Sequence, residues 1–156
     1  LVASGVFLIL VSVASATFLQ SLRAERVIAN FSSSVNNVSF AMETMAREVR
    51  TGCCFENSGE TSVLSFTNAN QEKVRYKMID KGISRCFTTV AEGCLSDGYK
   101  PLTAPEVKVS NLKFILTGVE RGDNLQSRIT IFVGVVGEKD LRVDLQTTIS
   151  SRIPDS

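Results

Sequence analysis

The first part of the chain is apolar and carries no charge. Residues 1–22 contain no Asp, Glu, Lys or Arg, and aliphatic side chains dominate. An α-helix rises about 1.5 Å per residue, so this stretch would extend roughly 33 Å, enough for a bilayer core of about 30 Å. We therefore predict a membrane-spanning helix half over residues 1–22. Its large apolar positions include Leu1, Val6, Leu8, Leu10, Val13 and Phe18.

A cleaved secretory signal peptide is the alternative for this segment. Such a peptide has basic residues before a shorter apolar stretch and small residues at its cleavage site. Ala14-Ser15-Ala16 would meet the second condition. The apolar run here is long, no basic residue stands before it, and a helical pattern continues beyond it. The anchoring helix is therefore the favoured interpretation.

Residues 23–52 keep a helical period but become amphipathic. Seven apolar positions are separated alternately by three and four residues, which places them on one face of a helix. No proline occurs before Pro101, and Gly52 is a candidate C-cap. We predict one nearly continuous helix from residue 1 to about 51. The stripe is short and poor in Leu for a coiled coil, so we expect a sheet to cover it. It consists of Ile28, Phe31, Val35, Val38, Met42, Met45 and Val49.

After Gly52 the apolar period changes to two, the period of a β-strand. Strands are predicted over 63–66, 73–78, 83–87, 107–116, 129–135 and 141–149, with turns at 80–82, 122–124 and 137–140. A change of phase near Asn111 predicts a β-bulge. The expected fold is α+β: a long N-terminal helix packed by its second half against an antiparallel β-sheet, with a β-rich globular domain over 53–156.

Composition removes most catalytic and electrostatic functions from consideration. The chain has 17 basic and 16 acidic residues, a net charge of +1, and no histidine. Balanced charge gives no reason to expect a nucleic-acid partner, and the commonest general base and metal ligand is missing. A basic run along one predicted strand region is interpreted as a solvated face, with weak polyanion contact as the alternative. It contains Lys73, Arg75, Lys77, Lys81 and Arg85.

Four cysteines, Cys53, Cys54, Cys86 and Cys94, favour disulfides in an exported domain. Three pairings are open. A bond between the neighbours Cys53 and Cys54 is the least favoured, Cys86 with Cys94 closes a short loop, and the others tie the helix end to that loop. Adjacent cysteines suit a zinc site poorly, and a catalytic thiol has no histidine to activate it.

No other motif in the sequence indicates an active site. The GxSxG, P-loop and GxGxxG patterns are absent from the sequence, and its acidic residues form no ligand-spaced cluster. Asp123-Asn124 after Gly122 is a turn with calcium binding as a remote alternative. We expect no enzyme activity and no cofactor.

Several sequence segments resemble the type IV pilin and pseudopilin superfamily. SLRAER (21–26) is similar to the middle of its signal-anchored helix, and FAMETMAREVRTG (40–52) resembles the helix end of J-like type II secretion pseudopilins. PLTAPEVKVSNLKFILTG (101–118) and LQTTISSR (145–152) look like late strands of the same group. The resemblance implies a prepilin-type protein with N-terminal methylation.

One feature departs from that family. In that family a prepilin peptidase cleaves before an N-terminal Phe or Met, and a glutamate follows within five residues. In this sequence the first acidic residue is Glu25. By register, Leu1-Val2-Ala3 corresponds to the stretch after that glutamate. We expect about six mature residues, and a leader of the kind that targets a chain for export, to precede Leu1.

The resemblance implies a structural and minor subunit of a type IV pilus or a type II secretion-like pseudopilus. It would be a single-pass bacterial cytoplasmic membrane protein with an extracytoplasmic C-terminal domain, assembled into a cell-surface or periplasmic filament. Its partners would be other pilin-like subunits, the assembly machinery and the membrane, with no small-molecule substrate. The alternative is a monomeric anchored binding module, an adhesin or DNA-uptake protein, that binds through the loop from Thr88 to Pro105.

Overall fold

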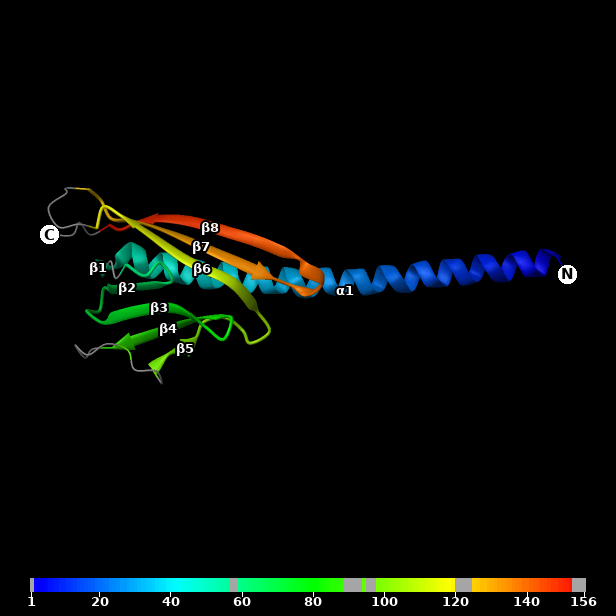
Figure 1. Ribbon diagram of the computed structural model, residues 1–156, viewed down its shortest axis with the longest axis horizontal. Helices are drawn as coiled ribbons and strands as arrows, with labels where there is room; N and C mark the ends of the chain where they lie inside the picture. The colour runs from blue at the N-terminus through cyan, green and yellow to red at the C-terminus, as the bar shows by residue number, and fades with distance from the viewer. Residues whose placement is uncertain (1, 57–58, 89–93, 95–97, 120–124, 153–156) are drawn as a thin grey trace.

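The computed structural model describes residues 2–56, 59–88, 94, 98–119 and 125–152. It begins with a single helix, α1 (Val2–Thr51), whose 50 residues extend about 75 Å. The first half of α1 projects from the globular domain as a shaft, while the second half packs inside it (Figure 1). The predicted continuous helix is therefore confirmed, including its end at residue 51.

Within the described residues, eight strands follow the helix and form two antiparallel sheets (Figure 1). The five-stranded sheet has the order β1-β2-β3-β4-β5 and the three-stranded sheet the order β6-β7-β8. A short 3₁₀ turn, η2 (Glu138–Asp140), joins β7 to β8. The strands are β1 (Cys53–Glu56), β2 (Val63–Thr67), β3 (Lys73–Ile79), β4 (Gly82–Thr88), β5 (Lys100–Pro101), β6 (Lys108–Thr117), β7 (Arg128–Val136) and β8 (Arg142–Ser150).

The sequence pattern located six of these strands, and the α+β class is confirmed. The β-bulge lies where it was predicted, between Val109 and Asn111. Asp80 and Lys81 form the tight turn between β3 and β4, both with positive φ. The short strands β1 and β5 were not predicted, nor was the division into two sheets. The predicted turn at 122–124 lies outside the described residues.

Main-chain hydrogen bonds join the two sheets beside β6. The Val109 amide donates to the Lys81 carbonyl and the Phe114 amide to the Thr61 carbonyl, both at 2.7 Å. Strands β7 and β8 run along the second half of α1 (Figure 1). One apolar core therefore extends from the helix through both sheets, and its largest fully buried side chains include Tyr76, Phe66, Phe114, Met45, Leu64 and Ile83.

The predicted helix stripe belongs to this core except at its first position. Val38, Met42, Met45 and Val49 are buried, and Phe31 and Val35 pack against the core while partly exposed.

The prediction for Ile28 is wrong, since its side chain is 62% exposed. The end of the β7–β8 hairpin lies against Phe31, where a Cβ added to Gly137 would lie 2.4 Å from the ring. Val27, one residue nearer the N-terminus, is partly buried and lines a groove with Gly137 and Glu138, so Ile28 is exposed because it lies on another side of the helix.

Gly52 follows the last helical residue, as predicted for a C-cap, but packing explains why it is glycine. Its amide donates to the Val49 carbonyl at 3.2 Å, and its φ is not left-handed. A Cβ added at this position would lie 2.5 Å from the buried ring of Phe66. The helix therefore ends where the chain has to pass closely under β2.

Candidate membrane-spanning and assembly surface

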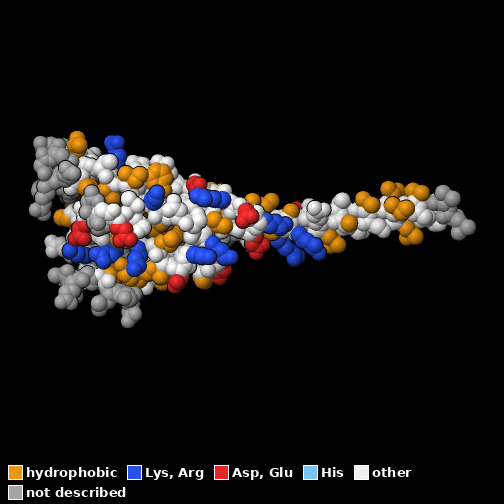
Figure 2. Space-filling model, viewed as in Figure 1, with side chains coloured by type: hydrophobic (Ala, Val, Ile, Leu, Met, Phe, Trp, Pro, Cys, Tyr) orange, Lys and Arg blue, Asp and Glu red, His pale blue; other side chains and the backbone are white. Residues whose placement is uncertain are grey.

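The first half of α1 is apolar around its whole circumference and lies away from the domain core. Within the described part of α1, the 18-residue window that is apolar enough to cross a membrane has none of its residues buried. Figure 2 shows this section as a narrow shaft with hydrophobic side chains along it. Its exposed large side chains are Val6, Phe7, Leu8, Ile9, Leu10, Val11, Val13, Phe18, Leu19 and Leu22.

The predicted membrane and assembly residues therefore lie on one exposed helical surface. Val6, Leu8, Leu10, Val13 and Phe18 are each more than half exposed. Leu1 lies outside the described residues. A helix that is hydrophobic on all sides is buried in a membrane or in a bundle. This half of α1 is long and apolar enough to cross a membrane.

Three hydroxyl groups within this apolar section bond to the helix itself. The Ser12 hydroxyl donates to the Leu8 carbonyl and the Ser15 hydroxyl to the Val11 carbonyl, each at 2.8 Å. The Thr17 hydroxyl lies 2.9 Å from the Ala14 carbonyl in the same kind of contact. Such bonds lower the cost of placing a hydroxyl in an apolar environment, because its proton is already shared with an oxygen atom.

A charged section of bare helix separates the apolar half from the globular domain. Arg23, Glu25 and Arg26 are exposed there. Figure 2 shows basic side chains gathered on the shaft just before it enters the domain. The exposed Ile28 belongs to the same section. The globular domain therefore begins to cover the helix near Val27.

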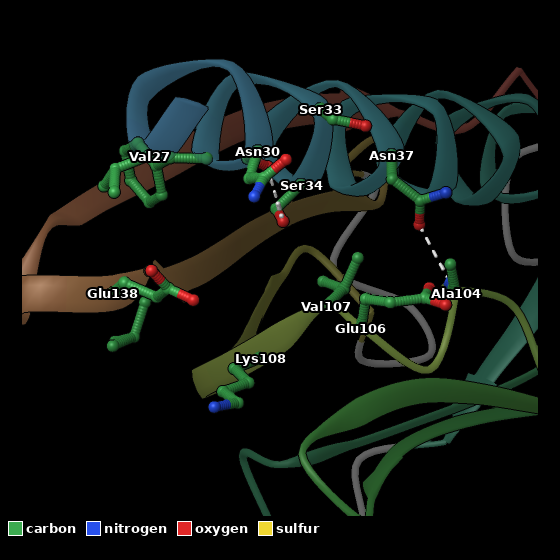
Figure 3. A pocket seen from close by; sticks show the side chains of 13 residues that line it. Val27, Asn30, Ser33, Ser34, Asn37, Ala104, Glu106, Val107, Lys108 and Glu138 are labelled. Carbon is green, nitrogen blue, oxygen red and sulfur yellow. Dashed lines mark hydrogen bonds between the residues drawn. The ribbon is translucent and has the colours of Figure 1, made fainter. Parts of the chain in front are cut away.

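A groove of about 460 Å³ with both polar and apolar lining residues opens where α1 enters the domain. Figure 3 shows helix residues on one wall and the 104–108 segment and the β7–β8 turn on the other. The Ala104 amide donates to the Asn37 side-chain oxygen at 3.0 Å and so joins the two walls at one end. The groove is lined by hydroxyl, amide, carboxylate and ammonium groups from Ser33, Ser34, Asn30, Glu106, Glu138 and Lys108.

Glu48 connects the second half of α1 to the five-stranded sheet. One carboxylate oxygen accepts a hydrogen bond from Arg85 and the other accepts one from the Tyr76 hydroxyl, both at 2.5 Å. The Glu48 and Arg85 side chains are each 24% exposed, and Tyr76 is fully buried. Burial, and then the hydrogen bond to Glu48, raise the pKa of Tyr76 well above its ordinary value.

The basic strand region makes specific contacts within the domain. Lys73 forms an ion pair with Glu56 at 2.9 Å, and Arg75 donates to the Ser65 hydroxyl at 3.0 Å. The Lys77 ammonium lies 4.7 Å from the centre of the Tyr99 ring. The Lys73–Glu56 and Arg85–Glu48 ion pairs offset two of the positive charges on this face.

Among the described residues, the structure contains one of the disulfide bonds that were left open. Cys86 and Cys94 are bonded, with their Cα atoms 6.1 Å apart, and the bond closes the short loop. The Cys54 thiol donates to the sulfur of Cys53 at 3.2 Å.

No metal site is formed by the side chains that the structure describes: no three Cys, Asp or Glu residues among them converge. The calcium candidate Asp123-Asn124 lies in the segment left undescribed, as does most of the stretch between Thr88 and Gly98 in the candidate binding loop.

Comparisons of the chain with protein-family models, curated proteins and solved structures give no match.

Proposed function

We propose that this protein is a structural subunit of a pilus or pseudopilus filament, stored in the membrane and assembled through the first half of α1. The observation that carries the proposal is the division of one helix into two surfaces. Val38, Met45 and Val49 are buried in the subunit's own core, whereas Leu8 and Leu10 of the same helix are 65% and 63% exposed. The exposed half needs an apolar environment that the described domain does not supply.

Two environments suit such a surface: lipid before assembly and helices of other subunits afterwards. Small side chains at Ser4, Gly5, Ala14 and Ala16 allow neighbouring helices to approach closely. The long apolar helix packed on antiparallel sheets is compatible with the pilin-like fold that segments of the sequence resemble. We further propose a minor subunit of a bacterial filament, because the sequence at 40–52 resembles J-like pseudopilins.

Membrane storage is tested by replacing Leu10 with arginine. Leu10 lies near the middle of the apolar half, where exchanging leucine for arginine costs insertion about 3–4 kcal/mol. We expect Leu10→Arg to lose most membrane retention in fractionated cells. Asn36→Arg is the matched control, since Asn36 is exposed on the same helix but beyond the apolar half. Equal retention of Leu10→Arg and the control would contradict membrane storage.

Assembly is tested by cross-linking through single cysteines placed between residues 4 and 15. The variants carry Cys53→Ser and Cys54→Ser, so that only the introduced thiol reacts while the Cys86–Cys94 bond remains. Neighbouring helices in a filament should give ladders of homologous or mixed multimers. Adding Leu10→Arg should abolish the ladders. A chain that stays in the membrane and never yields a ladder is the result expected of a monomeric binding module.

A further inference from the structure

Cys53 and Cys54 stand at the junction where α1 ends and β1 begins, in an unusual local geometry. Successive side chains of a regular strand point to opposite faces. Here Cys54 has a φ of +58°, and the pairing of β1 with β2 shifts register between Cys53 and Glu56. The irregular backbone brings the two sulfur atoms to 3.2 Å from one another. A left-handed backbone angle is uncommon for a residue other than glycine.

We propose that Cys53 and Cys54 form a reversible dithiol–disulfide couple, a redox modification site separate from the Cys86–Cys94 bond. Cys54 is exposed, which gives a small soluble oxidant access to its sulfur, and Cys53 is partly exposed. Only about 1.2 Å of approach separates the present sulfur positions from a covalent bond of about 2.05 Å.

The oxidation balances with a small-molecule disulfide as the electron acceptor. The Cys54 thiolate attacks one sulfur of glutathione disulfide, forms a mixed disulfide and releases one glutathione thiolate. The Cys53 thiolate then attacks the Cys54 sulfur, closes the Cys53–Cys54 bond and releases the second glutathione. The two protein thiols lose two protons and two electrons, and glutathione disulfide gains both electrons. Excess reduced glutathione runs both steps backwards.

This couple should be easier to reduce than the Cys86–Cys94 bond. Neighbouring Cα atoms are held about 3.8 Å apart by a trans peptide, below the usual disulfide range of roughly 4.4–6.8 Å. The Cα atoms of Cys86 and Cys94 are 6.1 Å apart, within that range. A bond forced outside the usual geometry is strained and more readily reduced.

Trypsin provides a direct test, because it separates the two cysteine pairs. Cleavage after Arg50 and Lys73 yields a 51–73 peptide with Cys53 and Cys54. Cleavage after Arg85 and Lys108 yields an 86–108 peptide with the other two cysteines, since the Lys100–Pro101 bond resists trypsin. The full chain in detergent micelles is equilibrated at graded ratios of reduced to oxidised glutathione, labelled with N-ethylmaleimide, digested and analysed by mass spectrometry.

We expect the 51–73 peptide to carry no maleimide in oxidising buffer and two in mildly reducing buffer that leaves the 86–108 peptide unlabelled. Two labels on the 51–73 peptide at every ratio would overturn the proposal. So would linkage of that peptide to the 86–108 peptide or to a second 51–73 peptide. The Cys53→Ser and Cys54→Ser controls cannot form the Cys53–Cys54 bond. Their 51–73 peptides should therefore carry only a single maleimide or a glutathione adduct.

Phenylarsine oxide gives a second readout on the reduced protein. Trivalent arsenic bonds both sulfurs of a close dithiol, and its oxygen leaves as water with the two thiol protons. We expect one phenylarsenic group on the wild-type 51–73 peptide and none on that peptide of the Cys54→Ser variant. Absence of the adduct from reduced wild-type protein would refute the close approach of the two thiols.

Discussion

At the scale of single residues, Glu48 joins the helix to two strands of the five-stranded sheet. Its two oxygens accept hydrogen bonds from Tyr76 of β3 and Arg85 of β4, residues 28 and 37 positions later in the chain. By contrast, Glu43 forms an ion pair with Arg47 on the exposed side of the same helix. The two glutamates therefore provide a matched pair of partly buried and exposed charges.

Replacing Glu48 with alanine should destabilise the domain by about 1–3 kcal/mol, because Arg85 and the Tyr76 hydroxyl lose their shared hydrogen-bond acceptor at a site largely shielded from solvent. Glu43→Ala should cost about 0.5 kcal/mol or less, since exposed ion pairs contribute little. Denaturant unfolding of the full chain in detergent micelles, followed by circular dichroism, measures both values. Equal losses for the two variants would show that the Glu48 contacts contribute no more than an exposed pair.

Tyr76 makes stability depend on pH in the alkaline range. Its pKa is raised in the folded state from an ordinary value of 10.0, so the unfolded chain loses the hydroxyl proton first. The stabilisation is complete below about pH 10 and falls above it, by up to about 1.4 kcal/mol per pH unit. We expect the wild-type advantage over Tyr76→Phe to shrink between about pH 9.5 and 11 in unfolding experiments. If the stability difference between wild type and Tyr76→Phe stays constant over this pH range, the Tyr76 hydroxyl does not have a raised pKa in the folded state.

The sequence pattern identified apolar core positions more reliably than polar contacts. Met42, Met45 and Val49 were predicted from spacing alone because helical period and burial are local properties. Glu48 lies outside the predicted apolar stripe, and nothing local distinguishes it from Glu43. Its partners are brought near only by the folding of β3 and β4. The close approach of Cys53 and Cys54 likewise depends on the left-handed backbone angle of Cys54, which no sequence pattern predicts.

At the scale of elements, the end of the β7–β8 hairpin determines where the covered part of α1 begins. The Gly137 amide donates to the Leu141 carbonyl at 2.8 Å and closes the turn against the ring of Phe31. Regular alternation located both strands, but it did not indicate how far along the helix the hairpin would reach. The pattern also assigned Ile28 to the core, whereas Val27 and Phe31 are the residues that line the groove at the hairpin end.

A methyl group at Gly137 should displace the hairpin end from the helix. A Cβ there would lie 2.4 Å from a ring carbon of Phe31, so Gly137→Ala should cost about 1 kcal/mol or more through overpacking. We expect faster hydrogen exchange at the Gly137 amide and its neighbours, measured by mass spectrometry. Gly5→Ala is the control, because nothing lies within 4 Å of its added Cβ. Unchanged exchange in Gly137→Ala would show that the turn accommodates the methyl group.

The sequence pattern also could not predict the number of sheets. Alternation shows which face of a strand is buried, but not which strand is its neighbour. β1 and β5 contain 4 and 2 residues, too few for a clear period. The junction beside β6 depends on main-chain hydrogen bonds from Val109 and Phe114, which every residue type except proline can donate.

At the scale of the whole molecule, the protein combines a folded domain with a shaft that adds nothing to the domain core. The apolar window of α1 has no buried residue, whereas the second half of α1 supplies Val38, Ala41, Met42, Met45 and Val49 to that core. The two halves of the helix therefore differ in what stabilises them, although the backbone passes from one to the other without a break (Figure 1).

Removing residues 1–22 should leave the domain folded and make it soluble without detergent. The deleted half makes no contribution to the core, so the thermal unfolding midpoint should match that of the full chain in micelles. Circular dichroism and gel filtration test both expectations. A lower midpoint for the shortened chain, or aggregation without detergent, would show that the apolar half protects or stabilises the domain.

The inward bonding of Ser12, Ser15 and Thr17 has a consequence for movement between environments. Each hydroxyl already shares its proton with a carbonyl of its own helix. Exchanging lipid tails for protein neighbours therefore breaks no hydrogen bond of these side chains, and leaves only differences in close packing between the two states. In the proposed filament, extraction from the bilayer and return to it would be nearly balanced for this part of the chain, and the direction of transfer would depend on work done elsewhere.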